Sequence, residues 1–258
     1  MLTVLGLLVC GLMAGLLGAM LGLGGGIFLV PALTLLFHLD LRVAAGTSLV
    51  CVIATSAGVA AIAGRGRGPD HTLALRLLVA TIAGAIAGGL VAGSLDRRVL
   101  SLLFATVVFA TAAYTVKRSR SQARGFAERL FHRDYVPTNW RAGLGLSALA
   151  GLISGLLGVG GGFLQVPMMY AVMGVPLGIA TATSNYMIGI TASASVFIYY
   201  GRGDIRPIVV VPAAVGVFAG AMVGAYLLPR LRAQWLRTVL VGLMIVMGLQ
   251  MAWQGVRP

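Results

Sequence analysis

The sequence predicts an all-α membrane protein made of two similar helical halves in tandem. The 258-residue chain is 59% hydrophobic and only 10% charged, with a mean hydropathy of +0.99, well outside the composition of soluble proteins. Apolar stretches of about 20 residues, each long enough to cross roughly 30 Å of hydrocarbon as a helix, cover most of the chain. The run AGLLGAMLGLGGGIFLVP, which begins at Ala14, returns as AGLISGLLGVGGGFLQVP, which begins at Ala150.

Four apolar blocks lie on each side of a basic segment. They cover residues 2–37, 43–63, 73–95, 99–116, 142–173, 177–200, 205–228 and 235–254. The segment between the two sets is dense in Lys and Arg, which is typical of a cytoplasmic loop. The sequence therefore predicts a first transmembrane repeat at residues 1–116, a cytoplasmic connector at residues 117–140 and a second transmembrane repeat at residues 141–258.

The first block of each half is too long for one straight span. Residues 2–37 would measure about 54 Å as a continuous helix, so we expect a break at the glycine triplet of residues 24–26, because each glycine weakens a helix. The block could then cross once or fold back as a hairpin, and the distribution of Lys and Arg fits both arrangements. We expect the hairpin, which leaves an odd number of crossings per half and so places the repeats in opposite orientations.

The remaining elements of each half follow the same repeat. Thr47 and Ser48 recur as Thr183 and Ser184, at the offset that separates Ala14 from Ala150. Pairs of small residues four apart recur as well, at Gly84 and Gly88, then at Gly216 and Gly220, with a third pair at Gly11 and Gly15. This spacing predicts close contacts between neighbouring helices.

The glycine triplets are the strongest candidates for a binding site. Unwound backbone at membrane depth is tolerated only where it is buried in protein or lines a cavity. A broken helix also leaves free N–H groups and the positive end of a helix dipole, which together favour an anion. We expect the two triplets to meet at one site. The alternative is that they only permit close packing of helices.

The carboxylates indicate the charge of the ligand. All six lie at connections or at block edges: Asp40, Asp70, Asp96, Glu128, Asp134 and Asp204. No intramembrane carboxylate is therefore expected to bind a cation or to relay a proton. Neutral hydroxyls and amides within the spans can instead donate hydrogen bonds to an oxyanion.

We therefore predict a substrate site made of the triplets and of nearby polar residues. The predicted residues are Gly24, Gly25, Gly26, Thr47, Ser48, Gly160, Gly161, Gly162, Gln165, Thr183, Ser184, Asn185 and Tyr186. The second half is the more polar, since Gln165 replaces Leu29 and Asn185 replaces Leu49 at matching positions. For the hydroxyl and amide side chains, hydrogen bonding between helices is the alternative role.

The paired boxes resemble those of the sulfite exporter TauE/SafE family of bacterial membrane permeases. The matching positions are Gly22, Gly24, Gly25, Gly26 and Pro31 in the first half and Gly158, Gly160, Gly161, Gly162 and Pro167 in the second. The resemblance covers essentially the whole chain. It implies transport of sulfite, sulfonates or similar anions across the bacterial cytoplasmic membrane.

Taken together, these features predict a secondary transporter for a small sulfur-containing oxyanion, with a passive anion channel as the alternative. We expect no enzymatic activity, because the spans hold no catalytic constellation such as Ser-His-Asp or HExxH, and no cofactor or metal. The net charge of +13 falls in the connections, so the expected partners are the lipid bilayer and the anion rather than nucleic acid. Basic residues at span ends, such as Arg42 and Arg202, are expected to anchor helices.

Overall fold

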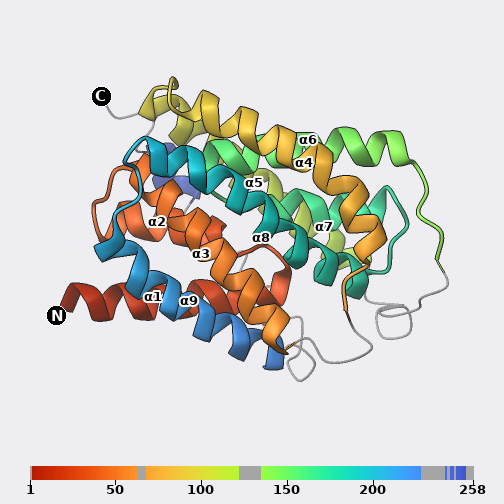
Figure 1. Ribbon diagram of the computed structural model, residues 1–258, viewed down its shortest axis with the longest axis horizontal. Helices are drawn as coiled ribbons and strands as arrows, with labels where there is room; N and C mark the ends of the chain where they lie inside the picture. Colours follow the sequence, from red (N-terminus) through yellow and green to blue (C-terminus); the bar gives the residue numbers. More distant parts are fainter. Residues whose placement is uncertain are drawn as a thin grey trace.

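The structure is a computed structural model that describes residues 2–62, 68–121, 135–227, 242, 245–246 and 248–253. These residues form helices and the loops between them, with no strand in any of these ranges. The helices are α1 (Leu2–Leu21), α2 (Gly26–Leu36), α3 (Leu41–Ile62), α4 (His71–Ala92), α5 (Arg97–Ser121), α6 (Trp140–Leu157), α7 (Gly162–Ala171), α8 (Leu177–Gly201) and α9 (Pro207–Leu227) (Figure 1). The all-helical prediction is confirmed.

Several of these helices are suited to a bilayer. Within the described part of the chain, five helices are long and apolar enough to cross a membrane, namely α1, α3, α4, α6 and α9. Helix α5 runs to Ser121, so it continues into the segment that the sequence assigned to the connector. The central part of that connector, residues 122–134, lies outside the described residues.

The helices recur at the spacing of the sequence repeat. Helices α2 and α7 begin at Gly26 and Gly162, and α3 and α8 begin at Leu41 and Leu177. Both pairs of starts are separated by the offset of the repeat, and the same separation holds for the starts of α4 and α9. The correspondence between the halves therefore extends from the sequence to the boundaries of the helices.

The first block of each half has its two ends close together. A Cβ built on Gly6, near the start of α1, would lie 3.3 Å from Cζ of Phe37 at the end of α2. In the second half, the amide of Thr138 just before α6 donates to the carbonyl oxygen of Met173 just after α7, at 3.1 Å. The two ends of each block therefore lie close together.

Corresponding helices of the two halves run in opposite directions in the view of Figure 1. Helix α1 begins at the left end beside the N-terminus, whereas α6 begins at the right end. Helix α4 begins at the right and α9 begins at the left. The long axes of these helices lie roughly along one common direction, as expected for a bundle that spans a bilayer.

The two halves interlock through glycine contacts. Helix α1 packs on α9, where a Cβ on Gly220 would lie 2.9 Å from Cα of Leu12. Helix α6 packs on α4 in the matching way, where a Cβ on Gly88 would lie 3.0 Å from Cα of Leu152. The first helix of each half is therefore held by the other half. The predicted role of the paired small residues in close helix packing is confirmed at these contacts.

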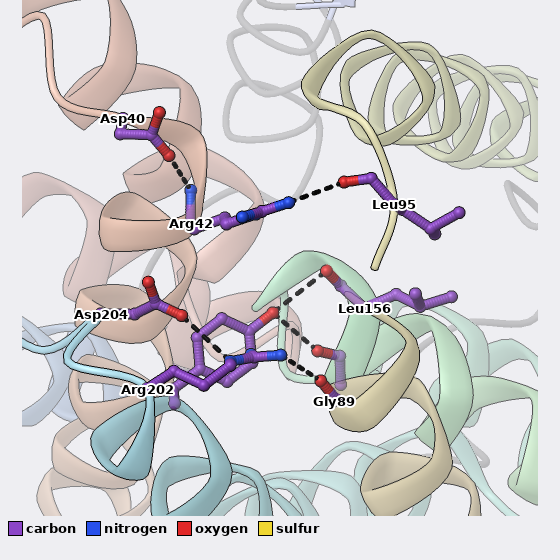
Figure 2. Close-up of polar contacts among 9 residues, drawn as sticks. Asp40, Arg42, Gly89, Leu95, Leu156, Arg202 and Asp204 are labelled. Atoms are coloured by element: carbon purple, nitrogen blue, oxygen red, sulfur yellow. Dashed lines mark hydrogen bonds and ion pairs between the residues drawn. The ribbon is translucent and has the colours of Figure 1, made fainter. Parts of the chain in front are cut away.

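Two arginines from different halves hold the end of α4, at Gly89, and the connection that follows it, at Leu95. Arg42, near the start of α3, donates from Nη2 to the carbonyl oxygen of Leu95 at 2.9 Å. Arg202, just after α8, donates from Nη1 to the carbonyl oxygen of Gly89 at 2.8 Å (Figure 2). A guanidinium is well placed there, because the last carbonyls of a helix lack intrahelical donors. Both arginines thus anchor helices, as the sequence predicts.

The glycine contacts predict a difference between two substitutions in α6. In Gly151→Ala the new Cβ would lie 2.8 Å from the carbonyl carbon of Thr81 and 3.0 Å from the amide nitrogen of Ala85. Because these are backbone atoms, α6 must move away from α4, and we expect a loss of roughly 1–3 kcal/mol of stability. Thermal denaturation of the purified protein in detergent measures this loss.

Gly145→Ala is the matched control, because nothing lies within 4 Å of its Cβ position. It exchanges the same residue types in the same helix, and alanine favours a helix by about 1 kcal/mol. We expect an unchanged or slightly higher melting temperature. Equal destabilisation by the two substitutions would contradict the packing explanation.

Candidate functional site

The glycine triplets form two breaks of the same shape. Helix α1 ends at Leu21 and α2 begins at Gly26, while α6 ends at Leu157 and α7 begins at Gly162. The positive φ angles within the breaks are 70° at Gly22, 76° at Gly24, 75° at Gly25, 70° at Gly158, 85° at Gly160 and 68° at Gly161. Glycine adopts this left-handed backbone without steric cost. The backbone is therefore unwound in both boxes, at equivalent positions.

The two breaks lie directly against each other. A Cβ on Gly26 would lie 2.8 Å from the carbonyl oxygen of Gly158, and a Cβ on Gly162 would lie 3.1 Å from Cα of Leu23. The side chain of Val52 on α3 reaches both boxes, because its Cγ1 would lie 3.2 Å from a Cβ on Gly24 and 3.0 Å from one on Gly160. Any side chain in place of these glycines would push the breaks apart.

Two serines join the halves reciprocally. Ser48 of α3 donates from Oγ to the carbonyl oxygen of Gly158 in the second break, at 2.7 Å. Ser184 of α8, its counterpart in the repeat, donates to the carbonyl oxygen of Gly22 in the first break, at 3.1 Å. Both side chains are fully buried. Each half thus supplies the hydroxyl that pairs a freed carbonyl of the other half.

A threonine completes this set. Thr55 of α3 donates to the carbonyl oxygen of Gly24 at 3.1 Å, sharing its proton with the carbonyl oxygen of Cys51 in its own helix. The predicted site did not include Thr55. The signal that could have found it is its recurrence as Thr191 at the repeat spacing.

The amides of the breaks, unlike these carbonyls, stay free. Among the described residues, the N–H groups of Gly24, Gly25, Gly26 and Ile27 have no hydrogen-bond acceptor, since the first amides of α2 that are paired are those of Phe28 and Leu29. The equivalent amides at the start of α7 are likewise unpaired within the described chain. A left-handed residue followed by a helical one turns successive N–H groups to one side, which forms a concavity suited to an anion.

The helix dipoles add to this effect. The N-termini of α2 and α7 both lie at the contact between the breaks, and each carries a partial positive charge. The described carboxylates, at Asp40, Asp70, Asp96 and Asp204, all lie at helix ends or in connections. The contact between the breaks thus offers unpaired N–H donors without a carboxylate from these four residues.

Two amide side chains of the second half lie beside the first break. Asn185 donates from Nδ2 to the carbonyl oxygen of Ala19 in the last turn of α1, at 3.4 Å. Ser184 Oγ lies 3.4 Å from Oε1 of Gln165 in the first turn of α7. Nε2 of Gln165 and Oδ1 of Asn185 are buried without a partner in the described structure. An unpaired buried polar atom costs about 1–3 kcal/mol. A bound anion would recover this cost at Nε2 of Gln165, which is a donor, but not at Oδ1 of Asn185, which is an acceptor.

Two of the predicted residues make other contacts, and a third makes no hydrogen bond in the described structure. The hydroxyl of Thr183 accepts a hydrogen bond from the amide of Asp70 at 3.0 Å. The ring of Tyr186 packs edge-on against His71, with 5.1 Å between the ring centroids. The buried hydroxyl of Thr47 has no partner among the described residues. The structure thus directs Thr183 and Tyr186 toward the start of α4 rather than toward the breaks.

Asp70 links that end of the molecule to the segment after the connector. Its Oδ1 accepts from the amide of Leu73 at 2.9 Å, which caps α4, and its Oδ2 accepts from the hydroxyl of Tyr135 at 2.5 Å. Burial raises the pKa of Asp70, but these hydrogen bonds to the carboxylate outweigh it and leave the pKa below its ordinary value. Burial and the nearby carboxylate raise the pKa of Tyr135.

Comparison with known proteins identifies relatives along almost the whole chain. A family model described as "Sulfite exporter TauE/SafE" matches residues 7–251. A "Probable membrane transporter protein YunE" of Bacillus subtilis is 24% identical over 266 residues, which cover 97% of each chain. A "Probable membrane transporter protein" of Haemophilus influenzae is 28% identical over 203 residues, covering 78% of this chain and 73% of the relative. No solved structure matches the chain.

The reciprocal serines predict a cost for removing either hydroxyl. Ser48→Ala leaves the buried carbonyl of Gly158 without a donor, so we expect the protein to lose about 1–3 kcal/mol of stability. Ser184→Ala should act similarly through Gly22. Ser193→Ala is the control, because Ser193 bonds only within its own helix, to the carbonyl oxygen of Gly189. Melting temperatures in detergent compare the three, and equal small shifts would contradict the prediction.

The contact between Asp70 and Tyr135 predicts an acid-dependent stability. Because folding lowers the pKa of Asp70, its contribution is present above the unfolded pKa and is lost as the pH falls through the folded pKa. Tyr135→Phe removes one of the hydrogen bonds that lower this pKa, so the folded pKa moves toward the unfolded one and the loss of stability in acid should be smaller and should be complete at a higher pH. Melting temperatures between about pH 2 and pH 7 test this. Asp70→Asn should weaken the dependence, and identical acid profiles in all three proteins would refute the assignment.

Proposed function

This chain belongs to the sulfite exporter TauE/SafE family, and on that premise we propose that it is a secondary transporter for a small sulfur-containing oxyanion. Membership of the family, with several helices able to cross a membrane, makes it a multi-pass membrane protein. Sulfite, a sulfonate or a similar anion is the proposed substrate, and the bacterial cytoplasmic membrane is the proposed location, with residues 117–140 on the cytoplasmic side.

One observation carries the proposed charge of the substrate: two breaks, each with unpaired amides at a helix N-terminus, lie against each other in the buried interior. Such a pair provides N–H donors and positive dipole ends for oxygen atoms with negative charge. Gln165 adds an unpaired Nε2 donor from one side, and Asn185 lies beside the first break through its bond to the carbonyl oxygen of Ala19. Gly24, Gly25, Gly26, Gly160, Gly161, Gly162, Ser48 and Ser184 complete the proposed site, the serines by pairing its carbonyls.

Transport in this proposal uses an inverted repeat. The opposite directions of α1 and α6 support it, as do the hairpins, which would enter the membrane and return on the same side. In such a repeat, the two halves can exchange roles, and the site then opens alternately to the two sides of the membrane. The reciprocal bonds of Ser48 and Ser184 are contacts that such an exchange would loosen in turn.

The driving force would come from the substrate itself. The four described carboxylates lie at helix ends or in connections, so none of them can act as a proton relay within the bundle. The anion would run down its own gradient, or a proton would travel on it as on hydrogen sulfite. Neutral donors suit this role because they bind an oxyanion without holding it permanently.

A passive anion channel is the alternative function. Residues 23–34 and 154–163 are buried throughout, which favours a carrier with a closed site over an open pore. Purified protein in liposomes distinguishes the two. A carrier should show saturable uptake of labelled sulfite or alkyl sulfonate, with counterflow, whereas single-channel currents would establish the channel. Uptake of chloride with equal efficiency would contradict selectivity for sulfur oxyanions.

Substitution of the box glycines tests the site. In Gly25→Leu the Cβ would lie 2.7 Å from the carbonyl oxygen of Ala14, and in Gly161→Leu it would lie 3.1 Å from that of Ala150, both at positive φ. We expect uptake to fall below about a tenth of the wild-type rate, because a misplacement of about 1 Å at a site can cost a hundredfold.

Gly174→Leu is the matched control for backbone strain. Gly174 also has a positive φ, of 74°, but nothing lies within 4 Å of its Cβ position. We expect it to retain most of the uptake, with all three variants normalised to the amount of folded protein in the membrane. Wild-type uptake by both box variants would refute the proposed site.

A further inference from the structure

The hydroxyl of Tyr199 holds the last turn of α6. Tyr199, near the end of α8, is fully buried. Its hydroxyl donates to the carbonyl oxygens of Gly155 at 2.9 Å and Leu156 at 3.2 Å (Figure 2). A phenol has one proton, so the two carbonyls share it. These carbonyls directly precede the second break, which begins at Gly158.

The ring of Tyr199 is fixed from several sides. The guanidinium carbon of Arg202 lies 4.4 Å from the centroid of the ring. Arg202 is held in turn by the carbonyl oxygen of Gly89 and by Asp204, whose Oδ2 lies 3.1 Å from its Nε. On the side of α3, a Cβ on Gly46 would lie 3.3 Å from Cδ1 of Tyr199. The tyrosine is thus wedged between α3 and α6, with a cation over its ring.

Among the described residues of the first half, no tyrosine makes the equivalent contacts at the end of α1. The residue that corresponds to Tyr199 in the repeat is Ala63, which lies outside the described residues and whose side chain has no hydroxyl. The carbonyl of Ala19, which corresponds to that of Gly155, accepts the longer bond of 3.4 Å from Asn185. The end of α6 is therefore paired more closely than the end of α1.

We propose that Tyr199, steadied by Arg202, is a positioning residue that fixes the second glycine break and so aligns the amides of Gly160, Gly161 and Gly162 for the anion. This inference rests on the proposed function, in which those amides bind the substrate. The chain of contacts is short: Tyr199 pairs the carbonyls of Gly155 and Leu156, and the carbonyl of Gly158 then accepts from Ser48. Without the phenol, the last turn of α6 loses its only donor from α8 among the described hydrogen bonds.

Tyr199→Phe tests this, with Tyr200→Phe as the matched control. Both substitutions remove one phenol oxygen from the same turn of α8, but Tyr200 is 71% exposed. For Tyr199→Phe we expect KM for sulfite uptake to rise roughly twofold to tenfold, the worth of one hydrogen bond, with little change in Vmax. Tyr200→Phe should match the wild type.

Hydrogen exchange gives a readout that does not depend on transport. In Tyr199→Phe, amides in a peptide spanning residues 150–165 should exchange faster, while those in the equivalent peptide of residues 14–29 should keep their wild-type rate. If wild-type protein took up none of the tested anions, the proposed function would fail, and the exchange rates would still decide whether Tyr199 fixes the break.

Two results would overturn the inference. One is a Tyr199→Phe protein with wild-type KM and wild-type exchange. The other is a lower melting temperature with unchanged KM, which would make Tyr199 a purely structural residue. If Tyr199→Phe fails to fold, Arg202→Gln decides: it keeps the phenol but removes the cation from the ring. A rise in KM and faster exchange in residues 150–165 support the proposal, and wild-type values for both overturn it.

Discussion

Every feature of this molecule depends on how it pairs backbone groups that are freed inside an apolar bundle. Where lipid replaces water, an unpaired carbonyl or amide costs several kcal/mol, so a helix can be broken only where donors are at hand. Ser48, Ser184 and Thr55 donate to carbonyls within the breaks, and Tyr199 donates to those just before the second one. The sequence repeat supplies two of these donors at once, because a serine in one half serves the break of the other.

The packing of the two halves against each other is linked to this pairing of backbone carbonyls. Glycines let α1 approach the backbone of α9 and let α6 approach that of α4, so the first helix of each half is supported mainly by the other half. Separate folding of the halves would leave the carbonyls of Gly158 and Gly22 without their serine donors. The pairing of the breaks and the packing of the helices are therefore one requirement, and substitutions in either should weaken the other.

Much of this could be predicted from the sequence, and what could not has physical reasons. The repeat spacing predicted equivalent helices, and the glycine triplets predicted unwound backbone. The distribution of Lys and Arg could not distinguish a hairpin from a single crossing, because both arrangements place the same number of basic residues on the cytoplasmic side. The closeness of Gly6 to Phe37 in the structure favours the hairpin. Ser184 reaches a break while Thr183 reaches Asp70, because neighbouring residues on a helix point about 100° apart. Tyr199 is remote from the boxes in sequence, and only the packing of α8 brings it to α6.

In the breaks, three carbonyls accept hydrogen bonds while the amides have no acceptor in the described chain, and this difference bears on whether a cation or an anion can bind. A cation binds oxygen lone pairs, yet the carbonyl oxygens of Gly22, Gly24 and Gly158 already accept hydrogen bonds from hydroxyl groups. An anion would find N–H donors that have no acceptor in the described chain. If the site binds an anion as proposed, this distribution of donors would disfavour sodium or potassium at the level of the main chain, before the size or shape of the solute is tested.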